Sequence, residues 1–114
     1  MSAAVSAAAP KMQAGADAYF ALVPEWVLED PKISDRAVRL YCRLSRFADY
    51  ETGQAYPSRK LLAHLCRCSL PTIDRGMKEL EAAGAVTSTP RFTDPDNPKV
   101  RTSNLYLLHR MAPS

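Results

Sequence analysis

Three serines, Ser34, Ser58 and Ser69, each stand just before a stretch in which apolar residues recur every three or four positions. A serine at that place caps a helix, because its hydroxyl accepts a hydrogen bond from a free backbone N–H of the first turn. The spacing puts the apolar residues on one helical face, which packs on a core. The sequence therefore predicts three short helices, over residues 35–48, 58–66 and 69–83. A chain of 114 residues has room for one compact domain around them.

Strand signals lie on either side of these helices. Beyond Gly84, a helix stop signal, residues 85–89 and 103–107 alternate weakly, and the prolines between them indicate a long hairpin tip. The apolar run 19–23 suits one short strand or an extended segment lying on the core. The predicted fold class is α+β and mainly α, with three helices, a C-terminal β-hairpin wing over residues 85–107 and a short N-terminal strand.

The chain divides into a tail and a domain. Residues 1–16 are mostly Ala, Ser and Gly, and they cannot bury enough apolar surface to offset the entropy of ordering them. We predict a disordered tail over residues 1–16 and one domain over residues 17–110. Near the start of the domain, residues 25–28 fit one helical turn, and Trp26 is the expected anchor.

Basic residues are concentrated in the middle of the chain. Overall, 15 Lys and Arg face 12 Asp and Glu, for a net charge of +3. Residues 34–78 alone carry nine basic residues against four acidic ones. Such a block suits a polyanionic partner, although blocks of this size also occur on solvated helices.

Several classes of function lack a signal in this sequence. No apolar run approaches 18 residues, which argues against a membrane span, and the first ten residues do not resemble a secretory signal, so we expect a cytoplasmic protein. Three cysteines indicate reduced thiols, and His64-x-Cys66-x-Cys68 lacks the CxxC spacing of a zinc site, so Cys66 and Cys68 are expected in the core. We find no catalytic motif and predict no enzyme, cofactor, metal or small-molecule ligand.

The predicted helices and hairpin occur together in a known family of proteins, which this sequence resembles. The stretch from Tyr56 to Ala63, followed by Cys68 to Val86, resembles the winged helix-turn-helix proteins of bacteria, phages and plasmids. The likeness covers residues 19–108 and is closest to the "VPEW" group, which includes small regulators and N-terminal domains of replication initiators. It implies duplex DNA binding, with helix 69–83 in the major groove and the hairpin as wing. The sequence departs from the family pattern in two ways: it has Arg67 where relatives often have Gly, and it has Leu70 and Pro71 where relatives are often polar or basic.

The periodicity of residues 69–83 supports this resemblance independently. At 100° per residue, Leu70, Ile73, Met77, Leu80 and Ala83 share one side, and Pro71, Arg75, Lys78 and Ala82 share the other. Arg75 can present two donors to guanine O6 and N7, Thr72 can touch a thymine methyl group or a phosphate, and Lys78 suits a phosphate.

Two further groups complete the predicted DNA-binding set. The residues 58–60 begin a helix, where free N–H groups favour a phosphate, and three basic residues flank the wing tip. The predicted set is Ser58, Arg59, Lys60, Ser69, Pro71, Thr72, Arg75, Lys78, Arg91, Lys99 and Arg101. A row formed by Arg36, Arg39, Arg43 and Arg46 could also bind phosphate, but such rows are more often solvated faces.

The biological role stays open at this level. The favoured hypothesis is a small transcriptional regulator. The alternatives are a plasmid or phage replication or partition domain and, from another class, a protein-interaction adaptor without DNA affinity. Two half-sites one helical turn apart would favour a homodimer, and the sequence contains no dedicated dimerisation helix.

Overall fold

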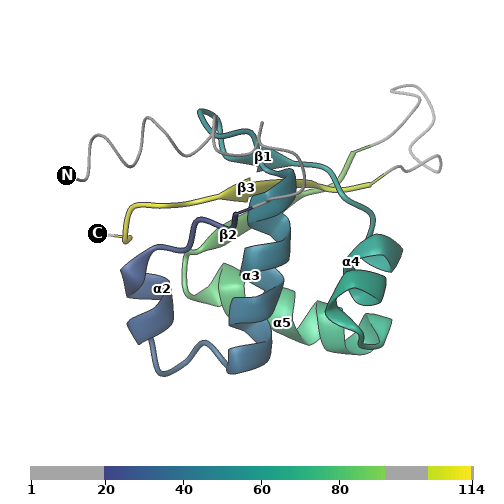
Figure 1. Ribbon diagram of the computed structural model, residues 1–114, viewed down its shortest axis with the longest axis horizontal. Coiled ribbons are helices and arrows are strands. Elements are labelled where there is room, and N and C mark those ends of the chain that lie inside the picture. Colours follow the sequence, from purple (N-terminus) through teal and green to yellow (C-terminus); the bar gives the residue numbers. More distant parts are fainter. Residues whose placement is uncertain (1–19, 92–102, 114) are drawn as a thin grey trace.

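The computed structural model describes residues 20–91 and 103–113 of the protein, and these residues build four helices and one three-stranded sheet. Figure 1 shows α3 in the middle of the molecule, with α2 and α4 on either side of it and the sheet above. In chain order the elements are α2 (Glu25–Glu29), α3 (Asp35–Phe47), β1 (Gln54–Ala55), α4 (Arg59–Cys66), α5 (Leu70–Ala82), β2 (Val86–Thr89) and β3 (Leu105–Leu108). The α+β, mainly α fold class is confirmed.

Each of the three longer helices begins at its predicted serine. The Oγ atom of Ser34 accepts the N–H of Ala37 at 3.2 Å. Ser58 caps α4 in the same way at 3.0 Å, and Ser69 caps α5 at 3.3 Å. All three serines have extended backbone angles, which is the geometry of an N-cap. The helix starts read from the sequence are therefore confirmed.

The end of α5 is set by Gly84. This residue has φ +80°, a left-handed conformation that only Gly adopts without strain. The N–H of Ala85 donates to the carbonyl of Leu80 at 2.8 Å, and the N–H of Gly84 donates to that of Glu81 at 3.1 Å. These two bonds form a Schellman motif, which satisfies free carbonyls of the last turn. The chain then turns directly into β2, as the stop signal predicts.

The sheet has the order β1-β3-β2, with both neighbours antiparallel to β3. The predicted hairpin is present as β2 and β3, which pair from Val86 with Leu108 to Thr89 with Leu105. Its tip, residues 92–102, lies outside the described residues. The third strand, β1, is not among the strands predicted from the sequence. It follows Gly53 (φ +76°), whose carbonyl accepts the N–H of Leu108 at 2.9 Å, and it pairs with β3.

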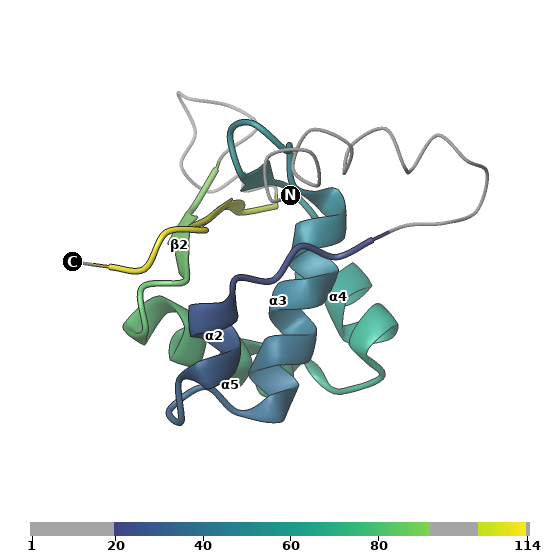
Figure 2. The same ribbon diagram turned by 60° about the vertical axis from the view of Figure 1, so that its left-hand side comes forward.

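The short strand expected from the apolar run 19–23 is not found in its described part, residues 20–23. That prediction is wrong, and the extended alternative is correct, because this segment has no strand assignment and crosses α3 on its way to α2 (Figure 2). The N–H of Leu22 donates to Ser45 Oγ at 2.9 Å. The predicted helical turn follows as α2, and Trp26 is an anchor, since its Nε1 donates to the carbonyl of Arg110 at 3.0 Å.

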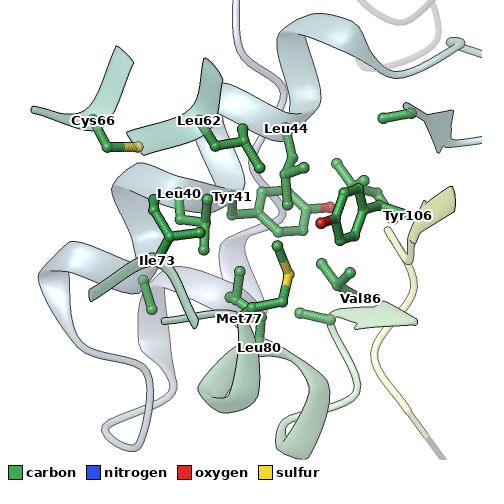
Figure 3. Close-up of a cluster of buried hydrophobic side chains, with 14 of the residues drawn as sticks. Leu40, Tyr41, Leu44, Leu62, Cys66, Ile73, Met77, Leu80, Val86 and Tyr106 are labelled. Carbon is green, nitrogen blue, oxygen red and sulfur yellow. The ribbon is translucent and has the colours of Figure 1, made fainter. Parts of the chain in front are cut away.

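The core lies where α3, α4, α5 and the sheet meet. Figure 3 shows Leu40, Tyr41 and Leu44 of α3 among side chains from the other elements. Cys66 is also buried there, and Cys68 packs against the core, as predicted, with both thiols free. The buried side chains of this cluster that are labelled in Figure 3 are Leu40, Tyr41, Leu44, Leu62, Cys66, Ile73, Met77, Leu80, Val86 and Tyr106.

Helices α3 and α5 cross closely at Gly76. A Cβ atom at this position would lie 3.2 Å from Leu40 Cδ2 and 3.8 Å from the Cα atom of Ala37. The missing side chain therefore lets the two helices approach, and this crossing fixes how the first turn of α3 sits beside the N-terminal half of α5.

Candidate nucleic-acid interface

The turn between α4 and α5 is made by a left-handed arginine. Arg67 has φ 56° and ψ 50°, and its N–H donates to the carbonyl of His64 at 3.2 Å. The N–H of Cys68 closes the turn on the carbonyl of Ala63 at 3.0 Å. A non-glycine residue in this conformation costs about 1 kcal/mol. The departure from the family glycine thus changes the energy of the turn and leaves its left-handed geometry in place.

Helix α5 has the two faces that its sequence predicts. Ile73, Met77 and Leu80 are buried, whereas Pro71, Arg75, Lys78 and Ala82 are exposed. An exposed face with two cations, on a helix that follows a tight turn, is free to meet a polyanion such as DNA.

Hydroxyl groups hold the Arg75 side chain along the start of α5. Arg75 Nη2 donates to Thr72 Oγ1 at 3.1 Å, and Thr72 Oγ1 lies 2.9 Å from Ser69 Oγ. The chain of contacts from Ser69 through Thr72 to Arg75 orders the guanidinium before any ligand is present. Less side-chain entropy is then lost when the guanidinium forms further hydrogen bonds.

An ion pair connects the start of α4 to α5. Arg59 Nε donates to Asp74 Oδ1 at 2.9 Å, and Nη2 donates to Oδ2 at 2.7 Å, with both side chains about half exposed. The hydrogen bonds to Asp74 raise the pKa of Arg59 above its ordinary value. The sequence places Arg59 on a phosphate, but in this structure its two donors already have a carboxylate partner. Ser58 and Lys60 beside it are exposed.

A cavity of about 690 Å³ lies between α5 and the sheet, and we call it the sheet-side cavity. Its lining combines cations and carboxylates with a buried apolar floor from the core. The charged residues that line it are Arg59, Lys60, Lys78, Asp74 and Glu81.

Arg91, the predicted wing residue that lies within the described part of the chain, contacts other residues of the protein. Arg91 Nε donates to the carbonyl of Ser103 at 2.9 Å, which joins the two ends of the hairpin, and its guanidinium lies 4.4 Å from the ring centre of Tyr56. A cation over an aromatic face at this distance is attracted to it. The other two predicted wing contacts, Lys99 and Arg101, lie outside the described residues.

A second cavity, of about 520 Å³, lies on the other side of α5, and we call it the turn-side cavity. It is bounded by the first turn of α3, the α4–α5 turn and the first half of α5. The residues that line it are Ser34, Arg36, Arg67, Cys68, Ser69, Thr72, Arg75, Gly76 and Glu79. Sequence reasoning did not assign Arg36 or Arg67 to the site. The available signal was the arginine row on α3, of which Arg36 is the first member.

The arginine row of α3 passes close to the end of α4. Burial raises the pKa of the Cys66 thiol, and the nearby positive charges of Arg43, Arg39 and Arg36 oppose that shift.

Among the described residues no group of His, Cys, Asp and Glu side chains is arranged to hold a metal ion. Within the same part of the chain, no helix has the length and apolar character needed to cross a bilayer.

Comparison with known families identifies the helix-turn-helix part of this fold. Residues 32–86, just under half of the chain, match the family model of a helix-turn-helix domain. This segment belongs to that family. The helix-turn-helix match runs from just before α3 to the first residue of β2, and α5 is the second helix of the motif, the one that such domains place in the major groove of DNA. Searches of curated proteins and of solved structures gave no match.

The helix-turn-helix domain carries the additions that the sequence resemblance implies. The β2–β3 hairpin follows α5 directly, which is the position of the wing in a winged helix-turn-helix. The recognition of a helix-turn-helix DNA-binding family and the winged fold class are thereby confirmed.

Proposed function

We propose that this protein binds duplex DNA sequence-specifically, with α5 in the major groove, and acts as a small transcriptional regulator. The observation that carries the proposal is the outer face of α5. Arg75 and Lys78 are exposed there, and Arg75 is ordered by its contact with Thr72. A helix with this face fits the width of the major groove, where base edges differ from one base pair to the next.

Each cation on this face has a proposed task. Arg75 reads a guanine through two donors, because its guanidinium extends from the exposed side of the first half of α5. Lys78, one turn further along, and Lys60, at the start of α4, meet phosphates and position the helix. Ser58, Ser69, Pro71 and Thr72 lie at the two helix starts and make short-range contacts to the backbone or to thymine methyl groups.

The wing residues are proposed to bind the neighbouring backbone or minor groove. Arg91 contributes less than an unrestrained arginine would, because it already contacts Ser103 and Tyr56. Lys99 and Arg101 remain sequence predictions.

A selection of bound duplexes from random DNA, made with the full chain at two salt concentrations, tests the proposal. A regulator should enrich one short motif at both concentrations, with the weaker overall binding at high salt that phosphate contacts produce. An enriched palindrome indicates two copies on one site, whereas direct repeats favour the replication or partition alternative. Absence of any DNA retention at low salt would reject the proposal and favour the adaptor alternative.

A further inference from the structure

The turn-side cavity brings together cations from three places in the chain. Arg36 comes from the first turn of α3, Arg67 from the α4–α5 turn and Arg75 from the exposed face of α5. Arg67 and Arg75 are 8 positions apart across the α4–α5 turn, whereas Arg36 lies 31 positions before Arg67 and is brought to them by the crossing of α3 and α5 at Gly76. The cavity volume of about 520 Å³ is within the range of pockets that hold small ligand groups, roughly 300–1,000 Å³.

The charge balance of this cavity favours an anion. Three guanidinium groups line it against one carboxylate, that of Glu79. Glu79 Oε1 is already engaged, because it accepts the N–H of Ser34 at 2.8 Å. Within residues 20–91 and 103–113, no carboxylate forms an ion pair with Arg36 or Arg67. The starts of α3 and α5, marked by the caps Ser34 and Ser69, both border the cavity and add their positive dipole ends.

We propose that the turn-side cavity binds one phosphate of the DNA backbone, with Arg36 and Arg67 as its ligands. This inference rests on the proposed function, and it assigns a backbone contact to the turn side of α5. The occupant is a backbone phosphate because the cavity shares Thr72 and Arg75 with the α5 face that enters the groove. A phosphate held there adds affinity beside the base pair that Arg75 reads, and the reading of the base itself stays with Arg75.

The left-handed backbone conformation of Arg67 supports a ligand-binding role for its side chain. Glycine would take this left-handed position without strain, yet the chain has an arginine there, with its side chain exposed at the cavity. Strain that is retained at a ligand-facing position is typical of functional sites.

The experiment compares two double variants of equal charge. Arg36→Gln with Arg67→Gln removes the two proposed ligands. Arg39→Gln with Arg43→Gln removes two arginines of the same α3 row that do not line the cavity. Affinity is measured on the selected duplex, with single backbone phosphates replaced one at a time by neutral methylphosphonates, and thermal unfolding verifies that both variants fold.

In the wild-type protein, one neutral phosphate beside the bases read by α5 should cost about tenfold in affinity, as expected for the loss of a charged hydrogen bond. In the Arg36/Arg67 variant, the same replacement should cause no further loss of affinity. The slope of log affinity against log salt should shrink by about one, and the preference for the selected bases should persist. The Arg39/Arg43 variant should keep the full penalty at that phosphate.

Three results would overturn the inference without touching the proposed function. They are equal sensitivity to every neutral phosphate in the wild-type and Arg36/Arg67 proteins, equal losses in the two double variants, and competition by millimolar inorganic phosphate at constant ionic strength that abolishes the contact, which would indicate a free-anion site. Failure of the wild-type protein to bind any duplex would instead refute the proposed function. Arg36→Gln alone keeps the test valid if the Arg67 change unfolds the chain.

Discussion

The two sides of α5 carry the same number of cations and use them differently. The sheet-side cavity is lined by Arg59, Lys60 and Lys78 against two carboxylates, and the turn-side cavity by three arginines against one. On the sheet side, Arg59 is held by Asp74 through two hydrogen bonds. On the turn side, the carboxylate of Glu79 accepts the backbone N–H of Ser34, the N-cap of α3. A count of basic residues therefore overstates the positive field more on the sheet side, where two carboxylates oppose the three cations, than on the turn side, where one does.

The difference in charge pairing predicts which side of α5 binds the phosphates of a duplex more readily. Exposed charges act on phosphates over roughly a Debye length, about 8–10 Å, so local pairing decides which side attracts DNA. A residue such as Arg59 must break or share its bonds to Asp74 before it can bind a phosphate, whereas Arg36 and Arg67 need not. Substitutions on each side of α5 test this asymmetry.

Arg75→Ala should produce the largest change. The guanidinium supplies two donors to one guanine, and the loss of such a contact costs about 1–3 kcal/mol of discrimination. We expect roughly 5- to 150-fold weaker binding to the selected duplex and little change on random DNA, measured by fluorescence anisotropy. Equal losses on both duplexes would assign Arg75 to a phosphate and remove the base-reading role.

The starts of the helices, and with them the exposed position of Arg75, could be predicted from the sequence. Ser34, Ser58 and Ser69 act locally, through bonds to N–H groups three residues ahead, and the apolar period needs no knowledge of the fold. For the same reason the exposed position of Arg75 followed from its place opposite Ile73 and Leu80.

Features that depend on packing could not be read in this way. The Arg59–Asp74 pair joins two helices over 15 positions, so it appears only once α4 and α5 are placed. Strand β1 has two residues, too few for alternation to show, and its pairing depends on β3, more than 50 positions away. The arginine row was judged as a whole, although only Arg36 reaches the turn-side cavity.

Lys60→Ala tests the sheet side with the next largest effect. Lys60 is exposed at the start of α4, and a lysine there contacts a phosphate as a point charge. Affinity should fall by a similar factor, roughly three- to tenfold, on the selected duplex and on random DNA, and the salt slope should shrink by about one. Lys32→Ala, an exposed lysine before α3, is the matched control and should change neither quantity. A shift in base preference would contradict the assignment of Lys60 to the backbone.

Asp74→Asn removes the carboxylate that distinguishes the two sides. The asparagine is nearly the same size, so the fold is retained, and the exposed ion pair contributes at most about 1 kcal/mol to stability. Arg59 then becomes available to a phosphate, and we expect several-fold tighter binding to random DNA with a salt slope that grows by about one. If the double variant Arg59→Gln with Asp74→Asn shows the same gain, the effect comes from removing repulsion and not from freeing Arg59.

Arg67→Gly should have the smallest effect on affinity among these variants and a separate effect on stability. Glycine relieves the left-handed strain of about 1 kcal/mol, and its greater freedom in the unfolded chain offsets part of that gain. The net stabilisation should be below about 1 kcal/mol, which raises Tm by a few degrees in a domain of this size. Affinity for every duplex should fall, because one ligand of the turn-side phosphate is lost. Arg67→Gln separates the two effects: it should lower affinity to the same extent and leave Tm unchanged. A glycine variant with wild-type affinity for every duplex would show that Arg67 does not contact DNA, and the turn-side phosphate would then lose one of its two proposed ligands.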